Sequence, residues 1–173
     1  MHAMAYPPLS SEQLREAWAA LIKDPNAPPD AELDEYGEVV VSPPPHPKHE
    51  RIVFALAKQL EAQLGGESGS VPILTRRGIR KPDVAWMADP EEWERLCEND
   101  AFPVAPTICI EVVSPGNNRR DLNDKLEAYL AAGAQEVIFV ERDGRIRFFD
   151  SDGERGESRF GLRLTLPRGT YPR

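Results

Sequence analysis

The chain has 173 residues, of which 40% are hydrophobic and 29% are charged. This length and apolar content suit one domain of ordinary size with its own core. The formal net charge of −8 argues against a protein that coats nucleic acid, because such proteins are usually basic. It does not exclude a nucleic-acid enzyme, whose metal-binding carboxylates add negative charge and whose phosphate contacts are local.

Cysteine usage and hydropathy bear on the compartment. Cys97 and Cys109 are the two cysteines, and their spacing is typical neither of a metal site nor of a disulfide framework. This favours a reducing cytoplasm. No apolar run approaches the ~20 residues that are needed to span a membrane, so the sequence predicts a cytoplasmic protein without a membrane partner.

The N-terminal stretch predicts a helix followed by a stop. Ser10 and Gln13 have the spacing of a capping box, and an apolar stripe follows at Leu14, Trp18, Leu21 and Ile22. Residues 24–29 are rich in proline and end this helix. We therefore distinguish residues 1–29, an N-terminal helix with a proline-rich lead-in, from a domain at residues 30–173.

The next elements follow from turn residues and apolar spacing. The sequence predicts a strand at 39–41, a stiff proline loop at 42–47, a helix at 49–64, a loop at 67–70 and an edge strand at 71–74. The helix has a core stripe at Ile52, Val53, Leu56, Leu60 and Leu64, and Gly65-Gly66 ends it.

The second half of the chain predicts a strand–helix–strand unit within a larger sheet. The expected elements are strands at 82–87, 107–113, 136–140, 146–149 and 160–166, and helices at 90–98 and 121–132. Asp143-Gly144 predicts a hairpin turn. The order indicates an α/β (α+β) domain with one core, in which helices flank a central mixed sheet and the unit 107–140 forms a right-handed crossover.

One acid conflicts with its surroundings. Glu111 stands in a strand whose two faces are both largely apolar, and burying an unpaired charge costs several kcal/mol. Asp83 begins another apolar strand, where on its own it is typical of an acid bound by nearby amides. Neighbouring strands lie ~4.8 Å apart, so acids on two of them can share a hard cation such as Mg²⁺.

Lys125 also stands on an apolar stripe, three residues after Leu122 and four before Tyr129. Such a lysine either extends past the core to solvent or points into a polar pocket, and Asp121 offers a surface partner. A helix that follows a strand returns antiparallel to it, so its first turns lie near the end of that strand. Asp83, Glu111 and Lys125 could therefore converge.

The chain contains an ordered set of short sequence motifs, which we call family words. They are Glu32-Leu33-Asp34 with Gly37-Glu38, Ser42-Pro43-Pro44 through His49, Gly78-Ile79-Arg80 with Pro82-Asp83-Val84-Ala85-Trp86, Glu111-Val112-Val113-Ser114-Pro115, Asn118-Arg119-Arg120, Lys125-Leu126 with Tyr129, and Ala132-Gly133-Ala134 with Glu136-Val137. The set covers roughly residues 30–150. It resembles the Uma2 (DUF820) family of bacterial restriction endonucleases in the PD-(D/E)XK nuclease superfamily.

The resemblance implies a restriction-endonuclease-like fold and a DNA substrate. It also implies Asp83 and Glu111 as ligands of Mg²⁺ or Mn²⁺, and a homodimer, which is common among such nucleases. The superfamily's usual lysine stands two residues after the second acid, where this chain has Val113. In Uma2-like chains a helix lysine matching Lys125 replaces it, which adds Lys125 to the expected catalytic residues.

Four further residues are weaker candidates. Glu38 and His49 match family words and could support the site, although a lone histidine at a helix start usually caps or packs. Arg80 and Lys81 precede Asp83 in the only dense basic run and could contact phosphates. A solvated charge run explains these two equally well.

Three functions follow. The leading hypothesis is a divalent-metal-dependent endodeoxyribonuclease that uses Asp83, Glu111 and Lys125. The alternative is a catalytically inactive nuclease-fold module that binds nucleic acid or protein, which the −8 charge and the missing strand lysine favour. A weaker third hypothesis is a carboxylate-pair hydrolase such as a glycosidase.

Overall fold

The structure is a computed structural model that describes residues 7–42 and 45–169. The helices in these ranges are α1 (Ser11–Leu21), α2 (Pro47–Leu64), α3 (Pro90–Leu96) and α4 (Arg119–Ala131). The strands are β1 (Ala31–Leu33), β2 (Val39–Val41), β3 (Glu67–Gly69), β4 (Ile73–Thr75), β5 (Gly78–Arg80), β6 (Val84–Met87), β7 (Ile108–Val112), β8 (Glu136–Val140), β9 (Ile146–Asp150) and β10 (Gly153–Arg155).

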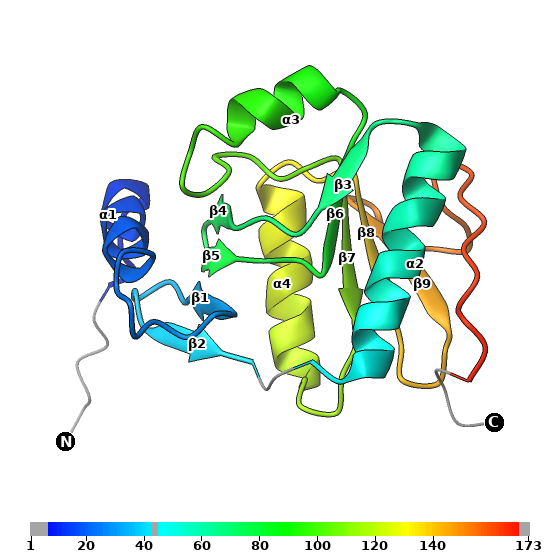
Figure 1. The fold of residues 1–173 in the computed structure, drawn as a ribbon, viewed down its shortest axis with the longest axis horizontal. Helices are drawn as coiled ribbons and strands as arrows, with labels where there is room; N and C mark the ends of the chain where they lie inside the picture. Colours follow the sequence, from blue (N-terminus) through cyan, green and yellow to red (C-terminus); the bar gives the residue numbers. More distant parts are fainter. Residues whose placement is uncertain (1–6, 43–44, 170–173) are drawn as a thin grey trace.

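The described strands form two sheets. The larger has six strands in the order β10-β9-β8-β7-β6-β3, in which β7 and β8 are parallel and the other neighbours antiparallel. The smaller has the order β2-β1-β5-β4 and lies between α1 and α4 (Figure 1). The predicted α/β (α+β) class with a central mixed sheet and flanking helices is confirmed.

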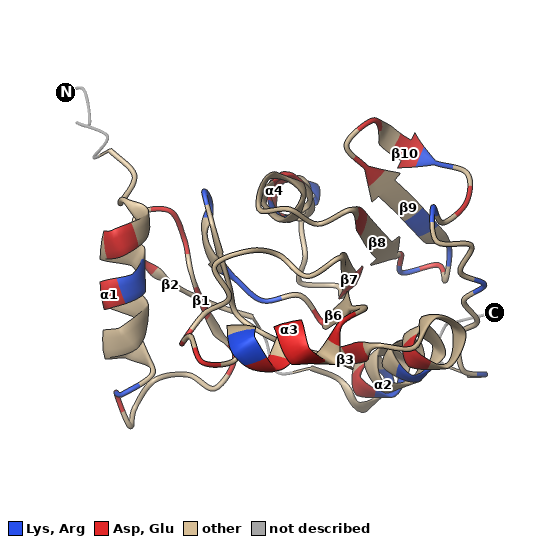
Figure 2. Ribbon diagram, turned by 90° about the horizontal axis from the view of Figure 1, so that it is seen from above, with Lys and Arg blue, Asp and Glu red and all other residues tan. Residues whose placement is uncertain are grey.

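Helices cover both faces of the larger sheet (Figure 2). Ile108, Ile110 and Val112 of β7 pack with α2, whereas Cys109 belongs to the cluster that contains Leu122 and Tyr129 of α4. Successive side chains of a strand point to opposite faces. Glu111 therefore shares the α4 face with Cys109, and this places an acid beneath that helix.

Helix α1 packs on the smaller sheet. Leu14 and Trp18 contact a cluster that contains Leu33, Leu74 and Ile79, and the predicted capping box of Ser10 and Gln13 is present. The expected stripe ends early, because Ile22 lies beyond the helix with 47% of its surface exposed. The division of the chain at residue 29 stays a prediction.

Two short strands differ from the expectation. Residues 67–69 form β3, which pairs with β6, although a loop was expected there. Residues 78–80 form β5 within the predicted basic run. Both strands contain glycine or polar residues of low strand propensity, so pairing with neighbours determines them. Gly78 has a φ of +101°, and an added Cβ would lie 2.0 Å from the Leu33 carbonyl oxygen.

The predicted strand at 160–166 is wrong. This C-terminal segment, residues 160–166, runs along α2 and bonds to two of its glutamine side chains. The Thr165 amide donates to Gln59 Oε1 at 2.8 Å and its carbonyl accepts from Gln59 Nε2 at 2.9 Å. Gln63 makes the same pair of bonds with Arg163. Side-chain amides therefore satisfy backbone groups that a neighbouring strand would otherwise pair with, and β10 takes the sheet edge instead.

Candidate active site

The register of β6 and β7 brings the two predicted acids together. Val84 pairs with Ile110, so continuing the antiparallel register by one residue places Asp83 opposite Glu111. The Val112 amide donates to Asp83 Oδ2 at 2.7 Å, which fixes the Asp83 carboxylate against β7. Both acids line a cavity of about 850 Å³.

Glu111 is buried, with 5% of its surface exposed, and its carboxylate has two donors. The Tyr129 hydroxyl donates to Oε1 at 2.6 Å, and Lys125 Nζ lies 3.1 Å from Oε1 and 3.3 Å from Oε2. Burial raises the pKa of Glu111 to about 7, against the opposing attraction of Lys125. The predicted convergence of Lys125 with Glu111 is present.

Lys125 lies between two carboxylates. Its Nζ also donates to Glu32 Oε1 at 2.9 Å, and its side chain is only 14% exposed. Burial acts to lower the pKa of the Lys125 amine, but Glu111 and Glu32 together raise it above its usual value. The amine is therefore a cation at neutral pH, which balances the two buried acids.

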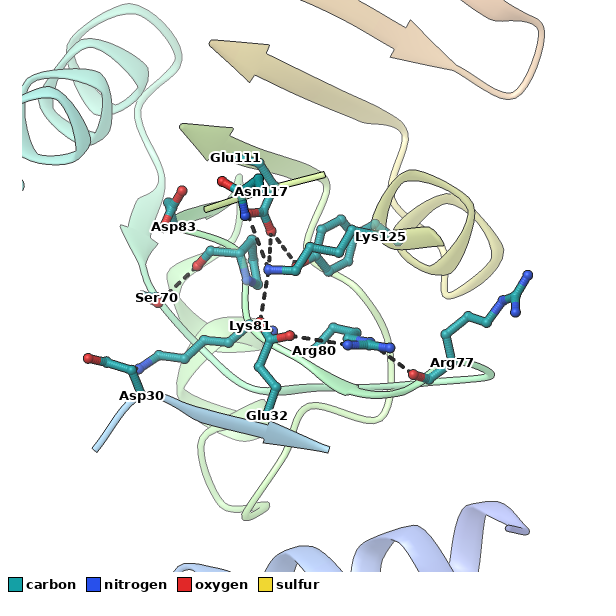
Figure 3. A network of polar contacts seen from close by, with 12 residues as sticks. Asp30, Glu32, Ser70, Arg77, Arg80, Lys81, Asp83, Glu111, Asn117 and Lys125 are labelled. Carbon is teal, nitrogen blue, oxygen red and sulfur yellow. Dashed lines mark hydrogen bonds and ion pairs between the residues drawn. The ribbon is translucent and has the colours of Figure 1, made fainter. Parts of the chain in front are cut away.

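Glu32 and Tyr129 are contacts that the sequence did not indicate. Glu32 Oε2 accepts from Arg80 at 3.4 Å and Oε1 accepts from the Lys81 amide at 3.0 Å, so a polar chain runs from Arg80 through Glu32 and Lys125 to Glu111 (Figure 3). Glu32 stood in a family word, but its strand β1 belongs to the other sheet. Tyr129 fitted the apolar stripe of its helix, so nothing in the sequence indicated a polar contact of its hydroxyl.

His49 contacts the other acid. Its Nε2 lies 3.3 Å from Asp83 Oδ2, and its Nδ1 lies 3.4 Å from the Glu50 carboxylate. The hydrogen bond with Asp83 raises the pKa of His49 to about 9, although burial opposes it. Helix α2 begins at Pro47 rather than 49, with His46 as its N-cap, and this places His49 in the first turn.

The remaining candidates lie in different surroundings. Glu38 is exposed, its amide donates to Asp34 in the turn between β1 and β2, and it does not line the cavity. The Arg80 guanidinium is paired inside the protein with Glu32 and Glu35. Lys81 lines the cavity, and its amine lies 3.8 Å from Asp30. Of these candidates, only Lys81 faces the space where a ligand would bind.

Asp83 and Glu111 are the candidate ligands for a metal ion. Among residues 7–42 and 45–169, no group of three or more His, Cys, Asp or Glu residues is placed to hold one. Asp83 Oδ1 makes no hydrogen bond within those ranges, since both donors bind Oδ2. Mg²⁺ usually takes one or two carboxylates and completes its shell with water and phosphate oxygens. Asp83 and Glu111 fit that pattern.

Comparison with known proteins gives the family. The model of the Uma2 family, described as "Putative restriction endonuclease", matches residues 15–167. The chain belongs to the Uma2 family. The resemblance predicted from the sequence words is thereby confirmed. No curated protein matches the chain.

A solved structure supports the Uma2 fold. It is described as a "putative nuclease belonging to DUF820" from Anabaena variabilis ATCC 29413, and it is 19% identical to this chain with a TM-score of 0.63. The match covers 86% of this chain and 93% of the other. The likeness shows a common nuclease-like fold.

No helix within the described ranges is long and apolar enough to cross a membrane.

In this Uma2 chain the family words converge in space although they are distant in sequence. The words that contain Glu32, Asp83, Glu111 and Lys125 contribute side chains to one cavity from β1, the residue before β6, β7 and α4. Val113, which stands two residues after Glu111, packs against the apolar cluster under α4. The Lys125 amine, which comes from that helix, reaches Glu111 instead.

Proposed function

We propose that this Uma2 protein is a divalent-metal-dependent endonuclease that hydrolyses phosphodiester bonds of DNA. One observation carries the proposal. Asp83 and Glu111 stand opposite each other in a cavity of about 850 Å³, and the Lys125 amine lies within 3.1 Å of Glu111. Two acids and a buried cation match the needs of phosphoryl chemistry, which develops negative charge on phosphate oxygens.

Asp83 and Glu111 would hold Mg²⁺ or Mn²⁺. A bound divalent ion supplies Lewis-acid polarisation of the phosphoryl group and a more acidic water. The protein contributes orientation. Tyr129 and Lys125 fix the Glu111 carboxylate, while His49 and the Val112 amide bind Asp83 Oδ2 and leave Oδ1 available. Such outer contacts set ligand geometry and basicity.

Lys125 and Lys81 would act on the substrate. The Lys125 cation stabilises the negative charge that grows at the phosphate in the transition state. Lys81 reaches the cavity wall beside Asp30 and binds a neighbouring phosphate, which positions the strand without reading its sequence. The net charge of −8 makes these local cations the expected contacts.

A cleavage assay tests the proposal. Purified protein is incubated with Mg²⁺ or Mn²⁺ and single-stranded, duplex or branched DNA. We expect cleavage that EDTA abolishes and that falls at least about 100-fold in Asp83→Asn and Glu111→Gln, since loss of outer contacts alone costs 10–100-fold. Glu141→Gln is the matched control, because Glu141 is equally buried and ion-paired but outside the cavity.

The outcomes separate the candidate functions. Intact DNA under every condition rejects the endonuclease for these substrates. DNA binding without cleavage, unchanged in Lys125→Ala, would support the non-catalytic module instead. Circular dichroism of each variant shows whether the fold is retained, so a loss of cleavage can be assigned to the site.

A further inference from the structure

We propose that Glu32 is a positioning residue that holds the Lys125 amine at the reacting phosphate; this inference rests on the proposed function. The contacts on the two sides of Lys125 carry it. Nζ lies 2.9 Å from Glu32 Oε1, closer than its 3.1 Å and 3.3 Å contacts with Glu111. Lys125 therefore has a partner that does not belong to the acid pair.

Glu32 is itself firmly held. Its side chain is 9% exposed. Each carboxylate oxygen accepts a hydrogen bond, one from a residue of β5 and the other from the residue that follows β5. Oε1 accepts from the Lys81 amide and Oε2 from the Arg80 guanidinium. A carboxylate with several fixed donors has little freedom to turn, so Glu32 offers Lys125 a stationary anchor.

The anchor matters when Glu111 binds a cation. If Glu111 held a divalent ion, charge repulsion and competition for the same carboxylate would weaken the contact of Lys125 with Glu111. A lysine side chain has four flexible carbons and no rigid geometry of its own. Glu32 would then keep the Lys125 amine beside the cavity.

Glu32 is placed to hold the lysine rather than the metal. Two cations, Arg80 and Lys125, already contact the Glu32 carboxylate, whereas Lys125 is the one cation that contacts Glu111 among residues 7–42 and 45–169. Glu32 also comes from β1 in the smaller sheet, on the side of Lys125 away from Asp83 (Figure 3). Its role is therefore exerted through Lys125.

Kinetics of Glu32→Gln and Glu32→Ala test this role. We expect kcat to fall about 10–100-fold in Glu32→Gln and further in Glu32→Ala. The KM for DNA and the half-saturating Mg²⁺ concentration should change less than about twofold. Glu141→Gln, with a side chain that is also 9% exposed, should match the wild type. A large rise in half-saturating Mg²⁺ in Glu32→Gln would make Glu32 a metal ligand and overturn the inference.

A second readout does not need activity. Amine labelling of the folded protein, read by mass spectrometry, reports how often Lys125 leaves its partners. We expect labelling of Lys125, relative to Lys58 on α2, to rise several-fold in Glu32→Gln and to stay unchanged in Glu141→Gln. Equal labelling in all three proteins rejects the inference. An inactive wild type that shows the expected labelling would reject the endonuclease and keep the anchor.

Discussion

Glu111 shows how a strand keeps an acid inside an apolar core. The cost of burying its charge is offset by a hydroxyl from Tyr129 and an ammonium from Lys125, both of which come from α4. These partners lie four residues apart, which is the spacing that puts two side chains on one helix face. One strand position and one helix face thus define the charged centre of the site.

Removing the Tyr129 hydroxyl should destabilise the protein. Tyr129→Phe leaves a fully buried ring in place but removes the 2.6 Å bond to Glu111. A hydrogen bond to a charged group contributes about 1.5–3 kcal/mol, and we expect that loss in the free energy of unfolding by urea. Tyr36→Phe is the control, since Tyr36 is 47% exposed, and it should change stability by less than about 0.5 kcal/mol. Equal stability of both variants would contradict the role of the hydroxyl.

His49 predicts a pH dependence of stability. Its pKa rises from 6.5 to about 9 on folding, so the folded state favours the protonated ring. The resulting stability is fully present below about pH 6.5 and is lost as pH rises through about 9, by at most about 3 kcal/mol. Urea unfolding in EDTA measures it. Glu111 contributes a pH dependence of stability with the same sign in a lower pH range. Because its pKa rises from 4.5 to about 7 on folding, its contribution is present below about pH 4.5 and is lost as the pH rises through about 7.

The Asp83→Asn variant should lose this alkaline dependence, because Asp83 is the main partner of His49. His46→Asn should keep it, since Asn is also a favoured N-cap residue and His46 does not contact Asp83. A wild-type stability that stays constant between pH 7 and 9 would show that the pair is not formed.

The residues that sequence analysis identified share a property. Asp83, Glu111 and Lys125 each carry a charge at a position where the apolar pattern expects none, and that conflict is visible in one dimension. Glu32 carries no such conflict, because β1 has only three residues and its sheet could not be foreseen. Its pairing with Lys125 spans 93 residues, and no local pattern encodes such a contact.

At the scale of elements, Gly78 allows β5 to approach β1 closely in the smaller sheet. Gly78→Ala would bring a Cβ within 2.0 Å of the Leu33 carbonyl oxygen and force a side chain into positive φ. Gly133→Ala is the matched control, with a φ of +115° and no atom within 4 Å of the added Cβ. We expect a loss of at least about 3 kcal/mol for Gly78→Ala and about 1–2 kcal/mol for Gly133→Ala, measured by urea unfolding. Similar losses of unfolding free energy in the two variants would show that β5 can shift to accommodate the added Cβ.

Elements differed in how far the sequence determined them. The helices have caps and apolar stripes, so α1, α2, α3 and α4 were placed within a few residues. The strands β7 and β8 have five buried residues each and were equally clear. The three-residue strands β1, β3, β5 and β10 depend on partners distant in the chain, and propensity does not mark them.

At the scale of the whole molecule, metal binding should raise stability. An ion that binds the folded state alone adds about 2.7 kcal/mol when its concentration is a hundred times Kd. We expect Mg²⁺ or Mn²⁺ to raise the Tm of the wild type and of Glu141→Gln, but not of Asp83→Asn or Glu111→Gln. A rise in all four proteins would place the ion elsewhere.

The order of elements was sufficient to predict a mixed sheet with helices on both faces, because alternating strands and helices restrict the possible layers. The order of elements was not sufficient to predict that the strands divide into two sheets. Strands β4 and β5 follow β3 and precede β6 in the chain but do not join their sheet, because β5 pairs with β1 and β4 pairs with β5. This separation gives the cavity two walls, one from each sheet.

The glutamine contacts of the C-terminal segment have a consequence for local unfolding. The backbone of Arg163 and Thr165 is bonded to two glutamine side chains of α2, half-buried Gln59 and exposed Gln63, and not to a strand. The segment can therefore detach without breaking a sheet hydrogen bond, at the cost of exposing Leu162, which is buried in the cluster under α2. We expect its amides to exchange with deuterium far faster than those of β8, and faster still in a Gln59→Ala, Gln63→Ala protein. This segment would then open and close as a separate cooperative unit, with its own equilibrium constant, while the candidate site stays folded.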